Sequence, residues 1–213
     1  MSIHKFLSKT LVAAAAAMAI CTIVPALASA TTAPPPLHTV PTPDTPAYLL
    51  DGGTGLPITT SQSYSLSGTV TLHGTSAPDI TCDASLTVRA DPSGIADVTS
   101  PSAFTNCTTS VPGCNAALAP TLDWGGRYVL DGNGDYRHRI SPYLTITFSG
   151  TCPYGPITYL GEESPIMTVN GSGEVEATFD GLGAGHIYSA LTAYYLTGTL
   201  TESSPPAGWA FGI

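Results

Sequence analysis

Short runs in which apolar and polar residues alternate make up the chain beyond about residue 60, and each run is cut off by glycine, proline, asparagine or aspartate. Successive side chains of a β-strand point to opposite faces, so these runs predict strands with one buried face. Their close spacing is typical of an antiparallel sandwich. The predicted strands cover residues 63–74, 80–90, 94–104, 125–130, 136–150, 157–161, 164–171, 173–181 and 186–203, with one helical turn allowed before Tyr194.

Two of the breaks have the composition of hairpin turns. In Asp91-Pro92-Ser93-Gly94, proline and glycine occupy the second and fourth places of a type I turn. In Asp131-Gly132-Asn133-Gly134-Asp135, glycine and asparagine tolerate a left-handed backbone. We therefore expect an all-β chain whose residues 61–203 form a single antiparallel β-sandwich, either immunoglobulin-like or jelly-roll-like.

The start of the chain has the three parts of a signal peptide. Lys5 and Lys9 give a basic beginning, residues 11–27 are apolar, and Ala28-Ser29-Ala30 is a small-residue cleavage site. Residues 1–30 are therefore predicted to direct export and to be removed. No later apolar run approaches the roughly 20 residues that span a bilayer, so we expect no membrane anchor after cleavage.

Charge narrows the set of partners. The formal net charge is −9, and it becomes −11 without Lys5 and Lys9, the only lysines of the chain. Nucleic acids and anionic lipids are bound through clustered lysine and arginine, so neither is an expected partner.

The two flanks of the predicted sandwich have a different composition. Six prolines lie between residues 31 and 46, and proline favours an extended backbone over a packed element. Residues 31–60 are predicted to be a Pro/Thr-rich spacer, or else a disordered N-terminus of the mature chain. Residues 204–213 are predicted to be a C-terminal tail.

Four cysteines follow the predicted signal peptide. An even number in an exported chain predicts two disulfides, for which three connectivities are open. The turn at residues 91–94 returns its second strand past Cys82 and brings Cys107 near, which favours Cys82–Cys107 and leaves Cys114–Cys152. No CxxC pair or neighbouring histidine favours a metal or redox site instead.

Asp131, Asn133 and Asp135 place oxygen atoms at alternate positions, as at the start of a calcium loop. However, Tyr136 stands where such a loop has glycine, and Pro142 stands where it has a bidentate glutamate. An ion-free hairpin tip is therefore favoured over a calcium site, and no other cofactor is expected.

Glu174 and Glu176 lie two residues apart, so on one strand both carboxylates face the same side, about 6–7 Å apart. Such a pair can serve glycoside hydrolysis as acid and as base or nucleophile. A strand face that is charged only to be solvated is the favoured alternative.

Aromatic residues are numerous for a chain with only 10% charged residues. Flat rings beside hydroxyls and carboxylates can stack on sugar rings. The candidate ligand-binding residues are Tyr143, Tyr194, Tyr195 and Trp209. The alternative is that the tyrosines close the ends of the sheets and that Trp209 folds back over the core.

Three segments carry a resemblance: CDASLTVRADPSGIADVTSPSAFTNC (82–107), PTLDW (120–124) and ITFSGTCPYG (146–155). In these segments the chain resembles secreted, uncharacterised β-rich proteins of high-GC Gram-positive bacteria, over about residues 60–155. The resemblance implies an exported β-sandwich with disulfides and supplies no catalytic residue.

Together these features predict a secreted, non-catalytic binding module, extracellular or associated with the cell wall. Its expected partner is a cell-wall polysaccharide or a surface protein. The first alternative is a polysaccharide hydrolase that uses Glu174 and Glu176. The second is a structural envelope protein that self-associates through faces rich in threonine.

Overall fold

The computed structural model describes residues 44–213 apart from 76, 122, 182–185, 188–193 and 204–207. All of them belong to the second of two units of the chain, residues 32–213. The predicted signal peptide, the spacer up to residue 43 and the helical turn before Tyr194 lie outside the described residues. Within the described ranges, no helix has the length and apolar character that a membrane crossing requires.

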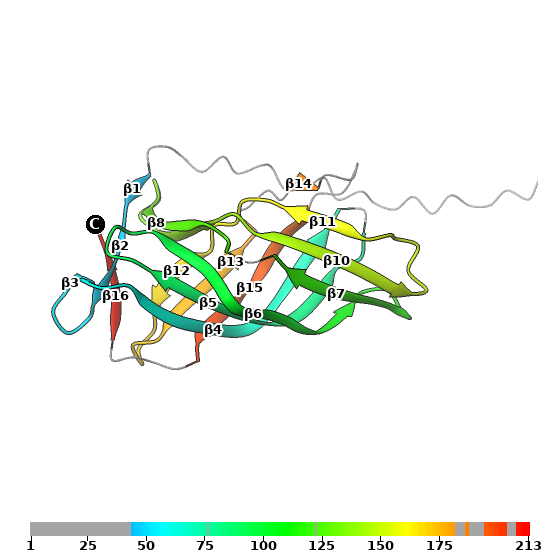
Figure 1. Cartoon of the computed structure of the whole chain (residues 1–213), viewed down its shortest axis with the longest axis horizontal. Helices are drawn as coiled ribbons and strands as arrows, with labels where there is room; N and C mark the ends of the chain where they lie inside the picture. The colour runs from blue at the N-terminus through cyan, green and yellow to red at the C-terminus, as the bar shows by residue number, and fades with distance from the viewer. Residues whose placement is uncertain (1–43, 76, 122, 182–185, 188–193, 204–207) are drawn as a thin grey trace, which may run out of the picture. The chain divides into compact units, whose positions relative to one another are not determined.

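The described residues form β-strands in antiparallel sheets (Figure 1), as the alternating runs predict. The largest sheet has nine strands in the order β1-β8-β9-β12-β13-β15-β4-β5-β6. Their bounds are β1 Thr45–Pro46, β4 Gln62–Gly74, β5 Ile80–Ala90, β6 Ala96–Thr109, β8 Gly126–Leu130, β9 Tyr136–Ile140, β12 Ile166–Val169, β13 Val175–Asp180 and β15 Tyr194–Glu202.

Two smaller sheets complete the described fold. A four-stranded sheet has the order β14-β11-β10-β7, and a three-stranded sheet has the order β16-β2-β3. The strands of the first are β7 Cys114–Pro120, β10 Tyr143–Gly150, β11 Ile157–Leu160 and β14 His186–Ile187. The strands of the second are β2 Tyr48–Asp51, β3 Leu56–Pro57 and β16 Trp209–Gly212.

Both predicted hairpin turns are confirmed. Gly94 donates its N–H to the carbonyl of Asp91 over 3.1 Å, and Gly134 does the same to Asp131 over 3.1 Å. The left-handed backbone of both glycines, with φ of 84° and 88°, explains the residue type at each turn. Each hairpin fixes the register of its strands and so decides which side chains face inward.

The nine-stranded sheet curls until its β6 edge returns to the region of β8. Val98 and Trp124 exchange two backbone hydrogen bonds of 3.0 Å, and Tyr128 donates its N–H to the carbonyl of Gly94 over 3.0 Å. We call this contact between β6 and the segment Trp124–Tyr128 the seam. Val98, Trp124 and Tyr128, which lie at the seam, belong to one buried apolar cluster.

One core joins the nine-stranded and four-stranded sheets. Inward residues of the large sheet, such as Leu72 and Leu196, belong to the same buried cluster as Leu144 and Ile146 of β10. The arrangement is therefore a sandwich-like all-β fold, as the sequence predicts.

Both predicted disulfides are confirmed. Cys82–Cys107 joins β5 to β6 with a Cα–Cα distance of 4.1 Å, and Cys114–Cys152 joins the start of β7 to the end of the β10 region with a Cα–Cα distance of 4.7 Å. Each bridge links strands that are already hydrogen-bonded neighbours.

The strands extend further toward both ends than the sequence boundaries suggest. Residues 45–57, assigned to the spacer, contain β1, β2 and β3, and the tail contains β16. β16 pairs with β2, which lies about 160 residues earlier, so no local pattern could reveal either strand. Residues 31–60 are instead rich in proline and threonine, a composition that is typical of a linker.

Candidate functional site

The three-stranded sheet places the last described aromatic residues beside the first described strands. In its register, Trp209 of β16 lies opposite Asp51 of β2, and Asp51 lies opposite Leu56 of β3. Residues opposite each other in a sheet share one face, so these three side chains form a row. Trp209 is half-buried, whereas Leu56 is 64% exposed.

A hollow with a volume of about 320 Å³ opens beside this row. Apolar and polar side chains both line it: Trp209, Leu56, Pro57, Ile58, Asp51, Thr54, Thr59, Thr60 and Gln62. We call it the Trp209 hollow.

Local hydrogen bonds hold the polar side of the Trp209 hollow in place. Asp51 accepts backbone N–H bonds from Gly53 over 2.9 Å and from Thr54 over 3.0 Å through Oδ1. The amide Nε2 of Gln62 donates to Thr60 Oγ1 over 3.1 Å. With a carboxylate, an amide and several hydroxyl groups in its lining, the hollow offers both donors and acceptors to a ligand.

A buried carboxyl fixes the indole ring of Trp209 from behind. Trp209 Nε1 donates to Glu202 Oε1 over 3.4 Å, and Glu202 Oε2 accepts the backbone N–H of Val175 over 3.2 Å. Burial raises the pKa of Glu202, while the hydrogen bonds from Val175 and Trp209 lower it. The ring is therefore held at the edge of the core rather than free to rotate.

The other three predicted ligand-binding aromatics do not join Trp209. Tyr143 lies on β10 of the four-stranded sheet and is 39% exposed, while Tyr194 on β15 is 1% exposed and faces the core. Tyr195 faces the opposite way, but its ring stacks on His73 with centroids 4.8 Å apart and lies close to Gly181. The four residues therefore lie on three different sheets and form no common platform.

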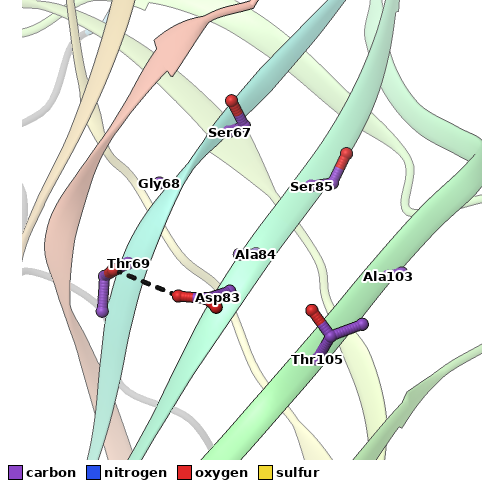
Figure 2. Close-up of a pocket in the computed structure, with 8 residues that line it drawn as sticks. All are labelled: Ser67, Gly68, Thr69, Asp83, Ala84, Ser85, Ala103 and Thr105. Atoms are coloured by element: carbon purple, nitrogen blue, oxygen red, sulfur yellow. Dashed lines mark hydrogen bonds between the residues drawn. The ribbon is translucent and has the colours of Figure 1, made fainter.

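A second hollow, of about 380 Å³, lies on the outer face of β4, β5 and β6. Figure 2 shows the hydroxyl groups of Ser67, Ser85 and Thr105 on three neighbouring strands, and the hydrogen bond from Thr69 to Asp83 over 3.4 Å. Serine and threonine side chains thus lie side by side on this face. It offers hydroxyls but no aromatic ring.

The two predicted catalytic carboxylates lie close together. Asn170 donates its side-chain N–H groups to Glu174 Oε2 over 2.8 Å and to Glu176 Oε1 over 3.2 Å. Both glutamates are half-buried, on the outer side of β13 and of the turn before it. The same-side prediction therefore matches the structure, with an amide group between the carboxylates.

The three residues of the predicted calcium site form the tip of the β8–β9 hairpin. Asp131 Oδ1 accepts the backbone N–H groups of Asn133 over 2.8 Å and Asp135 over 3.0 Å, and its Oδ2 accepts Arg137 Nε over 2.6 Å. Burial would raise the pKa of Asp131, but these hydrogen bonds outweigh it and hold the pKa below its usual range. Among the described residues, no group of three metal-ligating side chains converges.

Arg137 is one of the largest buried side chains in the fold. It is 2% exposed, and it also donates to the carbonyl of Ser164 over 2.7 Å and to Asp180 Oδ2 over 3.2 Å. Its charge is thus balanced by Asp131 and Asp180, which suits a structural ion pair.

Sequence reasoning missed most of the residues that line the Trp209 hollow. Four of them precede the predicted start of the sandwich at residue 61, and a fifth lies just after it: Asp51, Thr54, Thr59, Thr60 and Gln62. Only the pairing of β2 with β16 brings these residues to Trp209. The one local signal was the run of three hydroxyl residues, 59–61, directly before Gln62.

Comparison with known proteins gives no further guide, because no family model, curated protein or solved structure matches this chain.

Proposed function

We propose that the protein is an exported binding module that holds carbohydrate without cleaving it, and that its ligand occupies the Trp209 hollow. The natural partner would be a cell-wall or extracellular polysaccharide. Export is supported by the signal-like residues 1–30 and by the two disulfides, which persist in oxidising compartments.

One observation carries the proposal: a half-buried indole, fixed by Glu202, borders a hollow whose rim alternates carboxylate, hydroxyl and amide groups. A sugar ring has the complementary surface, with apolar C–H groups on its faces and hydroxyls around its edge. The net charge of −9 favours an uncharged glycan over an acidic one.

Tryptophan fluorescence tests the proposal directly, because the chain has two tryptophans and Trp124 is only 3% exposed. We expect the emission to change saturably when soluble cello-, chito- or xylo-oligosaccharides are titrated into the protein. The same protein should co-sediment with the corresponding insoluble polysaccharide without releasing sugar. Sugar release would favour a hydrolase instead.

Three variants locate the ligand. Trp209→Phe should weaken binding about 3- to 10-fold, the loss expected for a poorer stacking surface, and Gln62→Ala should weaken it through a lost hydrogen bond. Ser85→Ala removes an exposed hydroxyl from the hollow of Figure 2 and should leave affinity unchanged. If Ser85→Ala abolishes binding while Trp209→Phe does not, the Trp209 hollow is not the ligand site.

A further inference from the structure

Asp79, His73 and the sequence-distant Thr197 form a continuous hydrogen-bonded chain on the outer face of the large sheet. Asp79 Oδ2 lies 3.1 Å from His73 Nδ1, and His73 Nε2 lies 2.9 Å from Thr197 Oγ1. His73 is on β4, Thr197 is on the neighbouring strand β15, and Asp79 is in the connection between β4 and β5. None of the three takes part in the Trp209 hollow.

The neighbouring groups define the orientation of His73. Gly74 donates its backbone N–H to Asp79 Oδ1 over 3.3 Å, and Ser110 Oγ accepts the N–H of Asp79 over 3.1 Å. The ring of Tyr195 stacks on the imidazole. Both ring nitrogens and one ring face of His73 are thus held by specific partners.

This order of groups assigns the protons. A carboxylate accepts a hydrogen bond from Nδ1–H, which leaves the Nε2 lone pair for the hydroxyl proton of Thr197. A hydroxyl, an imidazole and a carboxylate in this order form the arrangement by which a hydroxyl becomes a nucleophile on unrelated folds. The side chains of His73 and Asp79 are 28% and 44% exposed, so a reactant can approach from solvent.

We propose that Thr197 is an acyl-accepting nucleophile, with His73 as general base and Asp79 as the residue that positions the imidazole. Thr197 Oγ1 attacks the carbonyl carbon of an ester, and its proton passes to His73 Nε2. The bond from the carbonyl carbon to the alcohol oxygen breaks, and the leaving alcohol takes that proton. Water then attacks the acyl group, gives a proton to Nε2, and releases a carboxylic acid as Thr197 regains its proton.

The surroundings select the class of substrate. The carboxylate of Asp79 lies beside the imidazole, so anionic esters are disfavoured. Thr197 is half-buried on the outer face of a strand that is paired on both sides. Small, uncharged acyl esters fit this position.

The sheet also predicts the speed of the reaction. β15 pairs with β13 on one side and with β4 on the other, so its backbone N–H groups serve the sheet and do not stabilise an oxyanion at Thr197. A missing oxyanion donor slows acyl transfer about 10²- to 10³-fold. Turnover should therefore be slow, and the covalent acyl intermediate is the species to measure.

The experiment uses p-nitrophenyl acetate as the probe, followed by acid quenching and peptide mass mapping. Lys5 and Lys9 are the only lysines, so acetylation of a lysine amine can be told apart from acetylation of Thr197 by the peptide that carries it. We expect one acetyl group on Thr197. His73→Gln should reduce its rate of formation by at least about 100-fold, and Asp79→Asn should also reduce it.

Thr199→Val is the matched control, because Thr199 is the next outward residue of β15 and its hydroxyl is bonded to Thr178 over 3.2 Å. It should leave the labelling of Thr197 unchanged, whereas Thr197→Val should abolish it. The thermal unfolding of each variant shows that it folds. The proposal is overturned if the acetyl group is found on His73 itself, if Thr197 stays unlabelled, or if His73→Gln labels as fast as the parent. None of these outcomes depends on whether carbohydrate binds at the Trp209 hollow.

Discussion

Glu163 shows how one residue connects separate parts of the fold. Its side chain is 1% exposed, its carboxylate accepts a hydrogen bond from the hydroxyl of Tyr159 on β11, and its backbone pairs with Ile140. Burial is the main reason that the pKa of Glu163 is raised to about 8; hydrogen bonds from Tyr159 and Leu196 lower it, and Asp180 raises it further. The folded protein therefore keeps Glu163 protonated where the unfolded chain has lost that proton.

The sign of the pH effect follows from this difference. Between about pH 4.5 and pH 8 the folded state binds more protons at Glu163 than the unfolded state, so its contribution to the free energy of unfolding falls as pH rises. The slope is at most about 1.4 kcal/mol per pH unit. Glu163→Gln should remove this slope and raise the melting temperature relative to the parent at pH 8.

Melting temperatures of the parent and the variant, measured from pH 5 to pH 8, check this prediction. Glu162→Gln is the control, because the neighbouring carboxylate is 62% exposed and lies 3.4 Å from Arg139. It should keep the pH slope of the parent. Parallel curves for the parent and Glu163→Gln would show that Glu163 does not titrate in this range. Other groups cancel in the comparison, including His138, whose pKa burial lowers to about 4.

At the scale of elements, turn chemistry was predictable and long-range pairing was not. The hairpins at residues 91–94 and 131–135 follow from glycine, proline and aspartate at fixed positions, and the pairing Cys82–Cys107 follows from the first of them. The seam between β6 and β8 has no such local signal, because it depends on the curvature accumulated over the whole sheet. The same limit applies to single faces: Tyr194 and Tyr195 are adjacent candidates, and only the strand register decides that Tyr194 faces inward.

Gly126 is the residue that allows the seam to close. A Cβ atom there would collide with the carbonyl oxygen of Ala96 on β6, and it would lie 2.8 Å from both the carbonyl oxygen of Arg139 and Nε2 of His138. Gly126→Ala should therefore lower the free energy of unfolding by about 1–3 kcal/mol, the usual effect of overpacking. Chemical denaturation measures this change.

Gly125→Ala is the matched control for the seam. A Cβ atom at Gly125 would meet nothing within 4 Å, so this neighbour should tolerate alanine with little change in stability. Equal stability of the two alanine variants would mean that the seam is not a tight contact in solution.

At the scale of the whole molecule, the class of fold was predictable, but the first and last residues of the folded region were not. Alternating runs and the cysteine count predict a disulfide-linked, sandwich-like fold, because neither signal requires knowledge of which distant strands pair. The three-stranded sheet joins the two ends of the described chain, so Trp209 could be proposed as a ligand-binding residue while its partners could not. Of the residues that line the Trp209 hollow, only Trp209 was predicted to bind a ligand.

The two disulfides should contribute to the stability of the whole domain. A bridge of this kind adds about 2–4 kcal/mol, chiefly by restricting the unfolded chain, and the two loops here span 25 and 38 residues in sequence. We expect a reducing agent to lower the melting temperature clearly. A variant with all four of these cysteines replaced by alanine should melt at a lower temperature and no longer respond to the reducing agent. An oxidised protein whose melting is insensitive to reduction would contradict a stabilising role for these bridges.

The pairing of β2 with β16 also has a mechanical consequence. Tyr48 lies opposite Gly212, so the outer ends of both strands, where the chain enters and leaves, are at the same end of the ladder. On the N-terminal side, a pulling force would first have to part β1 from β8. It would then open the β2–β16 ladder from the Tyr48–Gly212 end, one hydrogen bond at a time, and would reach the Asp51–Trp209 pair last. Tension on the described chain would thus be resisted by both pairings before it reached the residues of the Trp209 hollow.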